Sequence, residues 1–232
     1  MTFRKNQAAL TTQQWADFID AINQTHGVTA TAPRYRDFVK VHMRAMDAND
    51  PDGMSWNVHT MGRNMPGTNF FAWHRQLILR FEKRLQKVHA TITLPYWDAV
   101  NDRELPQALN DPELLKSWSV SRDWNSTELP SANDQKAVLT IPTFSAFQSA
   151  LEASVHNAVH RAVGGDMVSA GSPTDPLFFL HHANIDRLWA SWQAKHPGQD
   201  PPNADEVLKP KPLFGIKVAT LISTTGLGYE YR

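Results

Sequence analysis

Apolar residues recur at helical spacing in five segments of the chain. In residues 11–22, Trp15, Phe18, Ile19 and Ile22 fall on one stripe, and a threonine precedes them as a possible N-cap. The other segments with this period are 34–46, 70–89, 143–163 and 176–195. Glycine and proline pairs punctuate them, namely Pro66-Gly67, Gly164-Gly165 and Pro197-Gly198. The pattern therefore predicts four long helices and an additional N-terminal one.

The remaining segments lack a strong period. Residues 101–142 are polar and interrupted by proline, which predicts a loop with short helices, and residues 197–212 hold five of the 15 prolines. Residues 217–232 alternate weakly, as a short strand would. We therefore expect a mainly α fold, with residues 1–232 forming a single domain around a four-helix bundle core with long loops and little β structure.

Composition excludes several functional classes. The 232 residues carry 23 Lys and Arg against 23 Asp and Glu, so the chain has neither the basic excess of a nucleic-acid-binding protein nor a polybasic membrane anchor. There is no cysteine, which excludes disulfides, thiolate metal sites and cysteine nucleophiles. No apolar run is long enough for a membrane span, and no signal peptide is visible, so a cytoplasmic protein is expected.

Histidine is the enriched residue type that points to chemistry. His156 and His160 are four residues apart on a predicted helix, so both imidazoles leave the same face. His42, His74 and His182 lie on the apolar faces of three further predicted helices. A buried imidazole without a partner is costly, so several helices that each turn one inward favour a metal site in the bundle.

The donor set restricts the metal. Imidazole ligation without thiolates suits copper, zinc or nickel. A di-iron bundle would use Glu-x-x-His pairs, but Glu152 lies four residues before His156. Six histidines can hold two metals at three each, which leaves each metal an open position for chemistry.

The second half of the chain resembles the tyrosinase family of type-3 dicopper proteins. The sequence DPLFFLHHANID at 175–186 is similar to the family signature D-P-x-F-aromatic-x-x-H-x-x-x-D, and HNAVH at 156–160 followed by GGDM resembles a second family motif. The resemblance implies that His156, His160 and His182 hold one copper ion. The adjacent His181 would then pack behind the ligands.

The first half resembles the family's other copper-binding region. The motifs are FFAWHR at 70–75, YRDFVKVH at 35–42 and PYWD at 95–98, and they imply that His42, His59 and His74 hold the second copper ion. His59 lies 11 residues before Phe70, whereas most members place this histidine five or six residues before it, so a longer loop over residues 60–69 is expected. The chain ends also match, with RKN at 4–6 and YEY at 229–231. Without cysteine, the Cys–His thioether of some members cannot form, and we expect no C-terminal shielding domain.

The resemblance implies two copper ions that bind O₂, hydroxylation of monophenols at the ortho position, and oxidation of o-diphenols to o-quinones, with tyrosine-like and DOPA-like substrates leading to melanin. Glu152 and Asn157 resemble the pair that holds a proton-accepting water, and Arg161 resembles a pocket-mouth arginine that meets a substrate carboxylate. The alternatives are a catechol or o-aminophenol oxidase without monophenolase activity, hemocyanin-like O₂ binding, and a zinc hydrolase. A separate copper-delivery or shielding protein, and export with such a helper, remain open; neither nucleic acid nor a membrane is expected as a partner.

Overall fold

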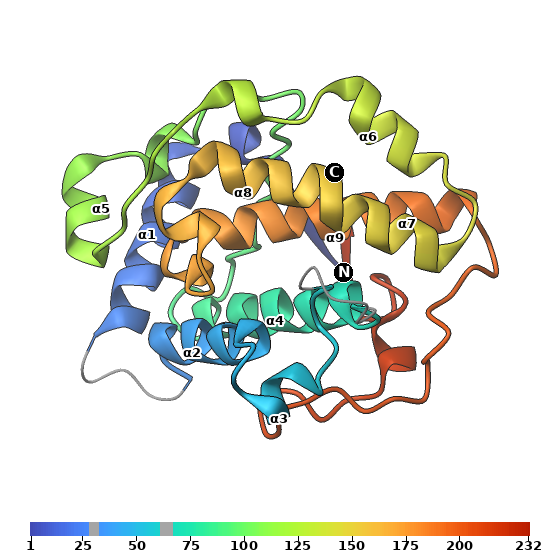
Figure 1. Cartoon of the computed structure of the whole chain (residues 1–232). Helices are drawn as coiled ribbons and strands as arrows, with labels where there is room; N and C mark the ends of the chain where they lie inside the picture. Colours follow the sequence, from blue (N-terminus) through green and yellow to red (C-terminus); the bar gives the residue numbers. More distant parts are fainter. Residues whose placement is uncertain (28–32, 61–66) are drawn as a thin grey trace.

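The computed structural model describes residues 1–27, 33–60 and 67–232 (Figure 1). The α-helices and strands are β1 (Thr2–Arg4), α1 (Thr12–His26), α2 (Tyr35–Met46), α3 (Pro51–Met54), α4 (Phe70–Leu85), α5 (Pro112–Trp118), α6 (Ala132–Leu139), α7 (Phe144–Leu151), α8 (Asn157–Val163), α9 (Leu177–Lys195) and β2 (Tyr229–Tyr231). Short 3₁₀ turns connect several of them. None of the helices in these ranges combines the length and the apolar character that crossing a membrane would require.

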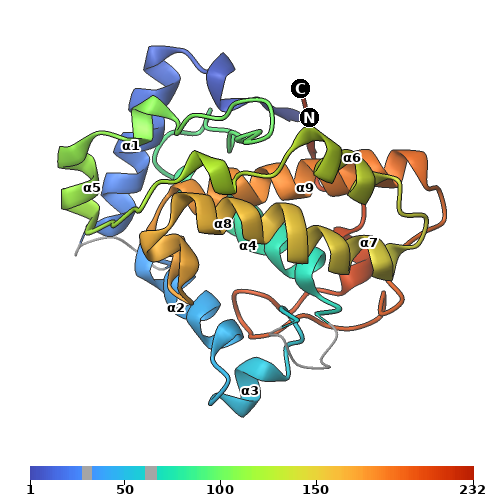
Figure 2. The same cartoon turned by 45° about the horizontal axis from the view of Figure 1, so that its top comes forward.

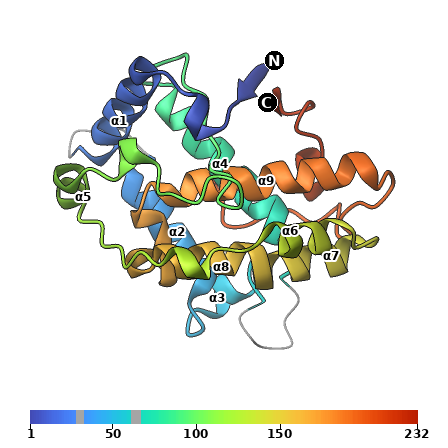
Figure 3. The same ribbon diagram turned by 90° about the horizontal axis from the view of Figure 1, so that it is seen from above.

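The core is a helical bundle, as the sequence predicts. Helices α2 and α4 form one side of it, while α9 and the rod that contains α7 and α8 form the other (Figures 1 and 2). Viewed from above, α9 crosses α4 near the middle of the molecule (Figure 3). Phe81 of α4 and Phe179 of α9 stack at this crossing with ring centroids 3.6 Å apart, and both are fully buried. Aromatic packing of this kind fixes the distance between the two sides.

The segment 143–163 differs from the uninterrupted helix expected from its period. Between α7 and α8, the five residues Glu152–His156 form a π-helical turn. This turn buries Glu152, Val155 and His156 together. A π-turn inserts one extra residue into the helix and rotates the residues after it, and such turns are common at functional sites.

Local signals set the helix ends. The side chains of Thr11 and Gln14 form a capping box at the start of α1. Gly164 ends α8 with a positive φ of 66°, and a Cβ there would lie 2.5 Å from the backbone oxygen of Asp123. Only glycine combines this backbone conformation with such a close approach. The predicted stop at Gly164-Gly165 is therefore confirmed.

The chain termini meet in a two-stranded parallel sheet. Thr2 pairs with Tyr229 and Arg4 with Tyr231, and the two ends lie side by side in Figures 2 and 3. The sequence predicted a short C-terminal strand from the weak alternation over residues 217–232, but not its partner β1, because residues 2–4 are too few to show alternation by themselves. Short helices within residues 101–142 are confirmed by α5 and α6. Most of the loop that was expected to be long, residues 61–66, lies outside the described residues.

Candidate metal centre

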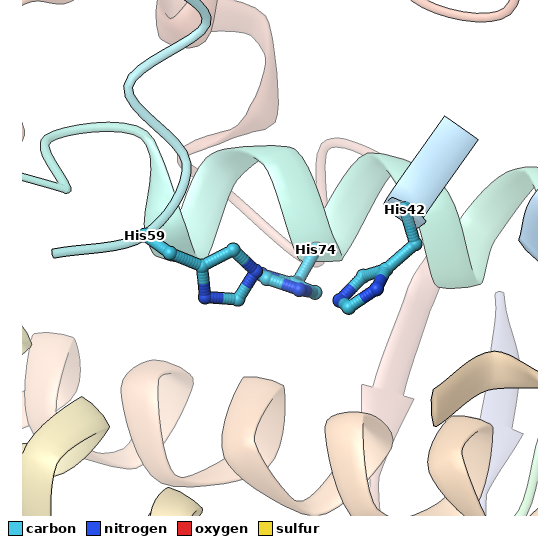
Figure 4. A group of neighbouring side chains, drawn as sticks. All are labelled: His42, His59 and His74. Atoms are coloured by element: carbon cyan, nitrogen blue, oxygen red, sulfur yellow. The ribbon is translucent and has the colours of Figure 1, made fainter. Parts of the chain in front are cut away.

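Three histidines from three different elements meet beside α4. His42 comes from α2, His74 from α4, and His59 from the chain between α3 and α4. Their rings gather in one place (Figure 4), and the potential ligand nitrogens all lie within 4.8 Å of one another. All three side chains are buried. The structure thus brings together the first predicted ligand set, although His59 is far from Phe70 in sequence.

A second histidine group faces the first. His156 precedes α8, His160 lies on it, and their ring centroids are 4.4 Å apart. The third nitrogen within 4.8 Å of these two comes from His181 of α9, whereas the sequence predicts His182. The ring of His182 lies between the two groups, 4.2 Å from the ring of His74 and 5.0 Å from that of His156. Seven imidazoles therefore surround the centre.

Five of these imidazoles are oriented by a hydrogen bond at Nδ1. The acceptors are the Ala170 oxygen for His42 (2.8 Å), Glu152 Oε1 for His59 (3.3 Å), the Phe70 oxygen for His74 (2.8 Å), Asn157 Oδ1 for His156 (3.0 Å) and the Met167 oxygen for His160 (2.6 Å). A proton held on Nδ1 leaves the Nε2 lone pair free for a metal. Partners of this kind fix both the tautomer and the orientation of a metal-binding histidine.

The free nitrogens of the centre lack protein partners. Among the described residues, no hydrogen bond reaches the buried Nε2 atoms of His59, His74, His156 and His160, or either ring nitrogen of His181 and His182. Each buried polar atom without a partner destabilises the fold. Bound metal ions would satisfy these atoms, and two sets of three imidazoles without carboxylate or thiolate ligands suit copper. The residues present therefore fit two copper ions.

The electrostatics of the centre favour neutral imidazoles. Burial, followed by the neighbouring histidines, lowers the pKa of His74, His156 and His182 well below the usual value. Burial also lowers the pKa of His160 to about 4. Protonated imidazole cannot bind a metal, so a lowered pKa keeps the nitrogens available at neutral pH.

His181 and His182 are distinguished by their surroundings. Successive residues on an α-helix point roughly 100° apart, so the two rings reach different parts of the site. His182 packs against Phe178, with ring centroids 4.1 Å apart, and stacks on His74. Burial, followed by the neighbouring His160, lowers the pKa of His181 well below its usual value. The signature thus favours His182 as the ligand, whereas the nitrogen positions favour His181.

Glu152 and Asn157 each contact one of the histidine groups. Glu152 Oε1 accepts hydrogen bonds from Nδ1 of His59 and from the amide of Thr60, at 3.3 and 3.1 Å. Its other oxygen, Oε2, is buried and has no hydrogen-bond partner in the described part of the chain. Asn157 accepts from His156. The side chains predicted to work together thus lie beside opposite halves of the centre.

A pocket of about 200 Å³ opens above the imidazoles and is lined by His42, His59, His156, His160 and other side chains that include Arg161. Arg161 is exposed and pairs with Glu128 at 3.2 Å, with about half of each side chain exposed. Surface ion pairs of this kind contribute little, so the guanidinium can exchange Glu128 for another carboxylate. Glu128 was not singled out from the sequence, because nothing local marks it as the partner of a residue 33 positions away.

A buried ion network supports both sides of the bundle. Arg4 of β1 donates to Glu82 of α4 at 2.8 Å and to Asp186 of α9 at 3.4 Å. Asp186 also accepts hydrogen bonds from Arg75 and Tyr229. It lies one helical turn after His182. These contacts give Asp186 a structural role and join both ends of the chain to the core.

Comparisons with known proteins agree with this geometry. The family model for the common central domain of tyrosinase matches residues 32–124 and 108–195. The tyrosinase of Streptomyces lincolnensis is 33% identical over 90% of this chain and 92% of its own length. A functional unit of octopus hemocyanin has a similar fold, with a TM-score of 0.76 and 24% identity over 100% of this chain and 68% of that one. The polyphenol oxidase of Thermothelomyces thermophila, solved as a mutant, gives a TM-score of 0.69 at 20% identity over 100% and 89% of the two chains.

Proposed function

The chain belongs to the tyrosinase family and is a type-3 copper phenol oxidase with two copper ions, and we propose that it acts on both monophenols and o-diphenols. In the first reaction one monophenol and one O₂ give one o-quinone and one water. In the second, two o-diphenols and one O₂ give two o-quinones and two waters. Bound copper would supply the activation of O₂ and accept electrons from the phenol.

The buried oxygen of Glu152 is the observation that carries this proposal. A monophenol must lose its hydroxyl proton before its ring can be hydroxylated, and a free phenol has a pKa near 10. Glu152 Oε2 is a carboxylate oxygen without a protein donor in the described ranges, 3% of the residue is exposed, and Oε1 of the same carboxylate is already held by His59. Such an oxygen can hold a water molecule that takes up the phenol proton.

Asn157 and Arg161 complete the proposed substrate site. Asn157 lines the pocket and accepts from the His156 imidazole, so its amide group can donate to the same water. Arg161 lines the pocket too, and its weak pairing with Glu128 leaves it able to bind the carboxylate of a tyrosine-like substrate. Phe178 packs against the rings of His42 and His182, which limits how far the imidazoles can move.

The deciding experiment measures O₂ uptake on tyrosine and on DOPA, together with copper content. Turnover of both substrates supports the proposal. Turnover of DOPA alone would contradict the monophenolase part and indicate a catechol oxidase. Reversible O₂ binding without turnover of either substrate would contradict the enzyme assignment in favour of hemocyanin-like binding.

We further propose that a separate protein delivers copper to the site or covers it. The pocket opens to solvent, and Val168, which lines it, has 60% of its surface exposed, so a partner that covers the pocket would bury apolar surface there. Copper uptake by the metal-free protein, measured with and without a cell extract, would test this. Cytoplasmic location stays a prediction from the sequence, which fractionation of the producing cells would check.

A further inference from the structure

A second and larger cavity lies away from the histidines. It has a volume of about 730 Å³ and is formed by α2, α4 and the proline-rich segment around residues 210–213. Its walls carry many cationic side chains, including Lys40, Arg80, Lys83, Lys87 and Lys211. Neither the sequence motifs nor the proposed reaction gives this cavity a role. We refer to it as the basic groove.

The cations of the basic groove lack counter-charges. Within the described ranges, none of these five side chains has an ion pair or a side-chain hydrogen bond. Asp37 is the acidic residue that lines the cavity, and it already accepts from the backbone amide of Arg34. Arg44, another lining residue, is paired with Asp50 and Asp52. The groove therefore keeps an excess of positive charge.

This concentration of charge is not explained by the chain as a whole. The net charge of the protein is zero, so a groove with five unpaired cations among the described residues stands out against a balanced surface. On α4 and the turn after it, Arg80, Lys83 and Lys87 lie at spacings of three and four residues, where like charges repel each other. Such an arrangement loses stability in the free protein and regains it when an anion binds.

The basic groove lies on the far side of the helices that carry the first histidine group. Lys40 is two residues from His42, which is about 200° around α2. Lys83 is nine residues from His74, about two and a half turns of α4. Both lysines thus point roughly opposite to the metal-binding rings, so a ligand in the groove would not compete with a phenol.

Size and lining indicate the kind of ligand. Small-molecule sites commonly enclose about 300–1,000 Å³, and this cavity falls within that range. Val41 and Leu213 contribute apolar surface, as do the aliphatic stems of the lysines. Arginine and lysine together are suited to phosphate and carboxylate groups.

We propose that the basic groove is a binding site for a compact polyanion, a small molecule with three or more phosphate or carboxylate charges. The cations come from two helices and one loop, so a ligand with several charges can contact all three elements at once. This site is independent of the phenol oxidase reaction.

The test uses isothermal titration calorimetry of the copper-loaded protein with inorganic tripolyphosphate and, separately, with citrate. The groove variant is Lys83→Gln/Lys87→Gln. The matched control is Lys5→Gln/Lys116→Gln, which removes the same charge from exposed positions outside the groove. A second groove variant, Leu213→Glu, places a negative charge on the cavity wall.

We expect 1:1 binding of at least one ion, and the tighter of the two identifies phosphate or carboxylate as the preferred group. The groove double variant should weaken it roughly tenfold or more, because two charge-assisted contacts are lost, and the control should change it by less than about twofold. Leu213→Glu should weaken binding as well. Equal losses in the two double variants, or no binding of either ion, would overturn the proposal. So would binding of an acidic peptide such as polyglutamate with neither small ion bound, since this would indicate a protein partner.

Discussion

The two histidine groups reach the same chemistry by different routes. The first draws its rings from α2, from the chain after α3, and from α4, so its assembly depends on three separate packing contacts. The second takes two rings from one helical rod and needs only α9 to complete it. The difference teaches that the helix itself fixes the relative positions of ligands spaced along it, whereas tertiary packing must bring scattered ligands together.

The largest expected effect concerns the third ligand of the second group. His182→Ala should remove about one copper ion of two and nearly all oxidation of DOPA, because the signature places this residue at the metal. His74→Ala serves as the reference for loss of a ligand from the first group. Copper content by atomic absorption, alongside O₂ uptake, measures both.

His181→Ala is the matched variant for this prediction. It should keep both copper ions and most activity. If it loses copper as fully as His182→Ala does, the ligand chosen within the pair is wrong, and the nitrogen positions in the structure identify the true one.

The next largest effect concerns the network that holds α9 against α4. Asp186→Asn should lower the free energy of unfolding by about 3–5 kcal/mol, because it leaves buried arginines without their full counter-charge. Urea denaturation measures this. The control is Asp205→Asn, whose exposed pairing with Lys217 should contribute less than about 1 kcal/mol. Similar losses of unfolding free energy in the two variants would show that burial of the network does not contribute to stability.

Variants of Glu152 and Asn157 test the two histidine groups separately, since each of these residues contacts one group. Glu152→Gln should reduce kcat/KM for tyrosine by roughly a hundredfold, and that for DOPA much less, because only the monophenol needs the proton acceptor. Asn157→Gly should act in the same direction but more weakly. Steady-state O₂ uptake on both substrates gives these ratios. Equal losses on tyrosine and DOPA would argue for a purely structural role through the imidazoles.

Metal-free protein should become less stable as the pH falls below about 6.5. The folded-state pKa of His160 is lowered to about 4, so the unfolded chain binds a proton that the folded chain resists. Stability is therefore fully present above the unfolded pKa and is lost progressively between about 6.5 and 4. The buried His74 and His156, whose pKa values are also lowered, act in the same direction. Urea unfolding after chelation, at pH 7.5 and at lower pH, should show this decline; a constant stability would contradict it.

The smallest effect is expected at the pocket mouth. Arg161→Gln should raise KM for tyrosine by roughly threefold to tenfold, with little change in kcat, because an exposed arginine contributes modestly to carboxylate binding. Tyramine lacks the carboxylate and serves as the control substrate. An equal rise in KM for tyramine would contradict the proposed contact between Arg161 and the substrate carboxylate.

Local patterns in the sequence predicted much of the molecule. The five segments with apolar residues at helical spacing correspond to α1, α2, α4, the α7–α8 rod and α9. This agreement arises because each helix in a bundle must bury one stripe of apolar side chains. The His156–His160 spacing located two of the three histidines of the second group for the same reason. The strand β1 and the short helix α3 were missed, since each is too short to show a period.

Other features exist only in three dimensions. The π-turn that buries Glu152 beside His59, the pairing of Arg161 with Glu128, and the basic groove all join residues distant in sequence. The choice between His181 and His182 depends on side-chain placement within one turn of α9. The sequence by itself determined which residue types the site contains and which helices carry them, because periodicity and spacing are local properties. Only the tertiary structure decided which imidazole nitrogens converge and which of the described oxygens and cations lack partners, because those facts depend on how the helices pack.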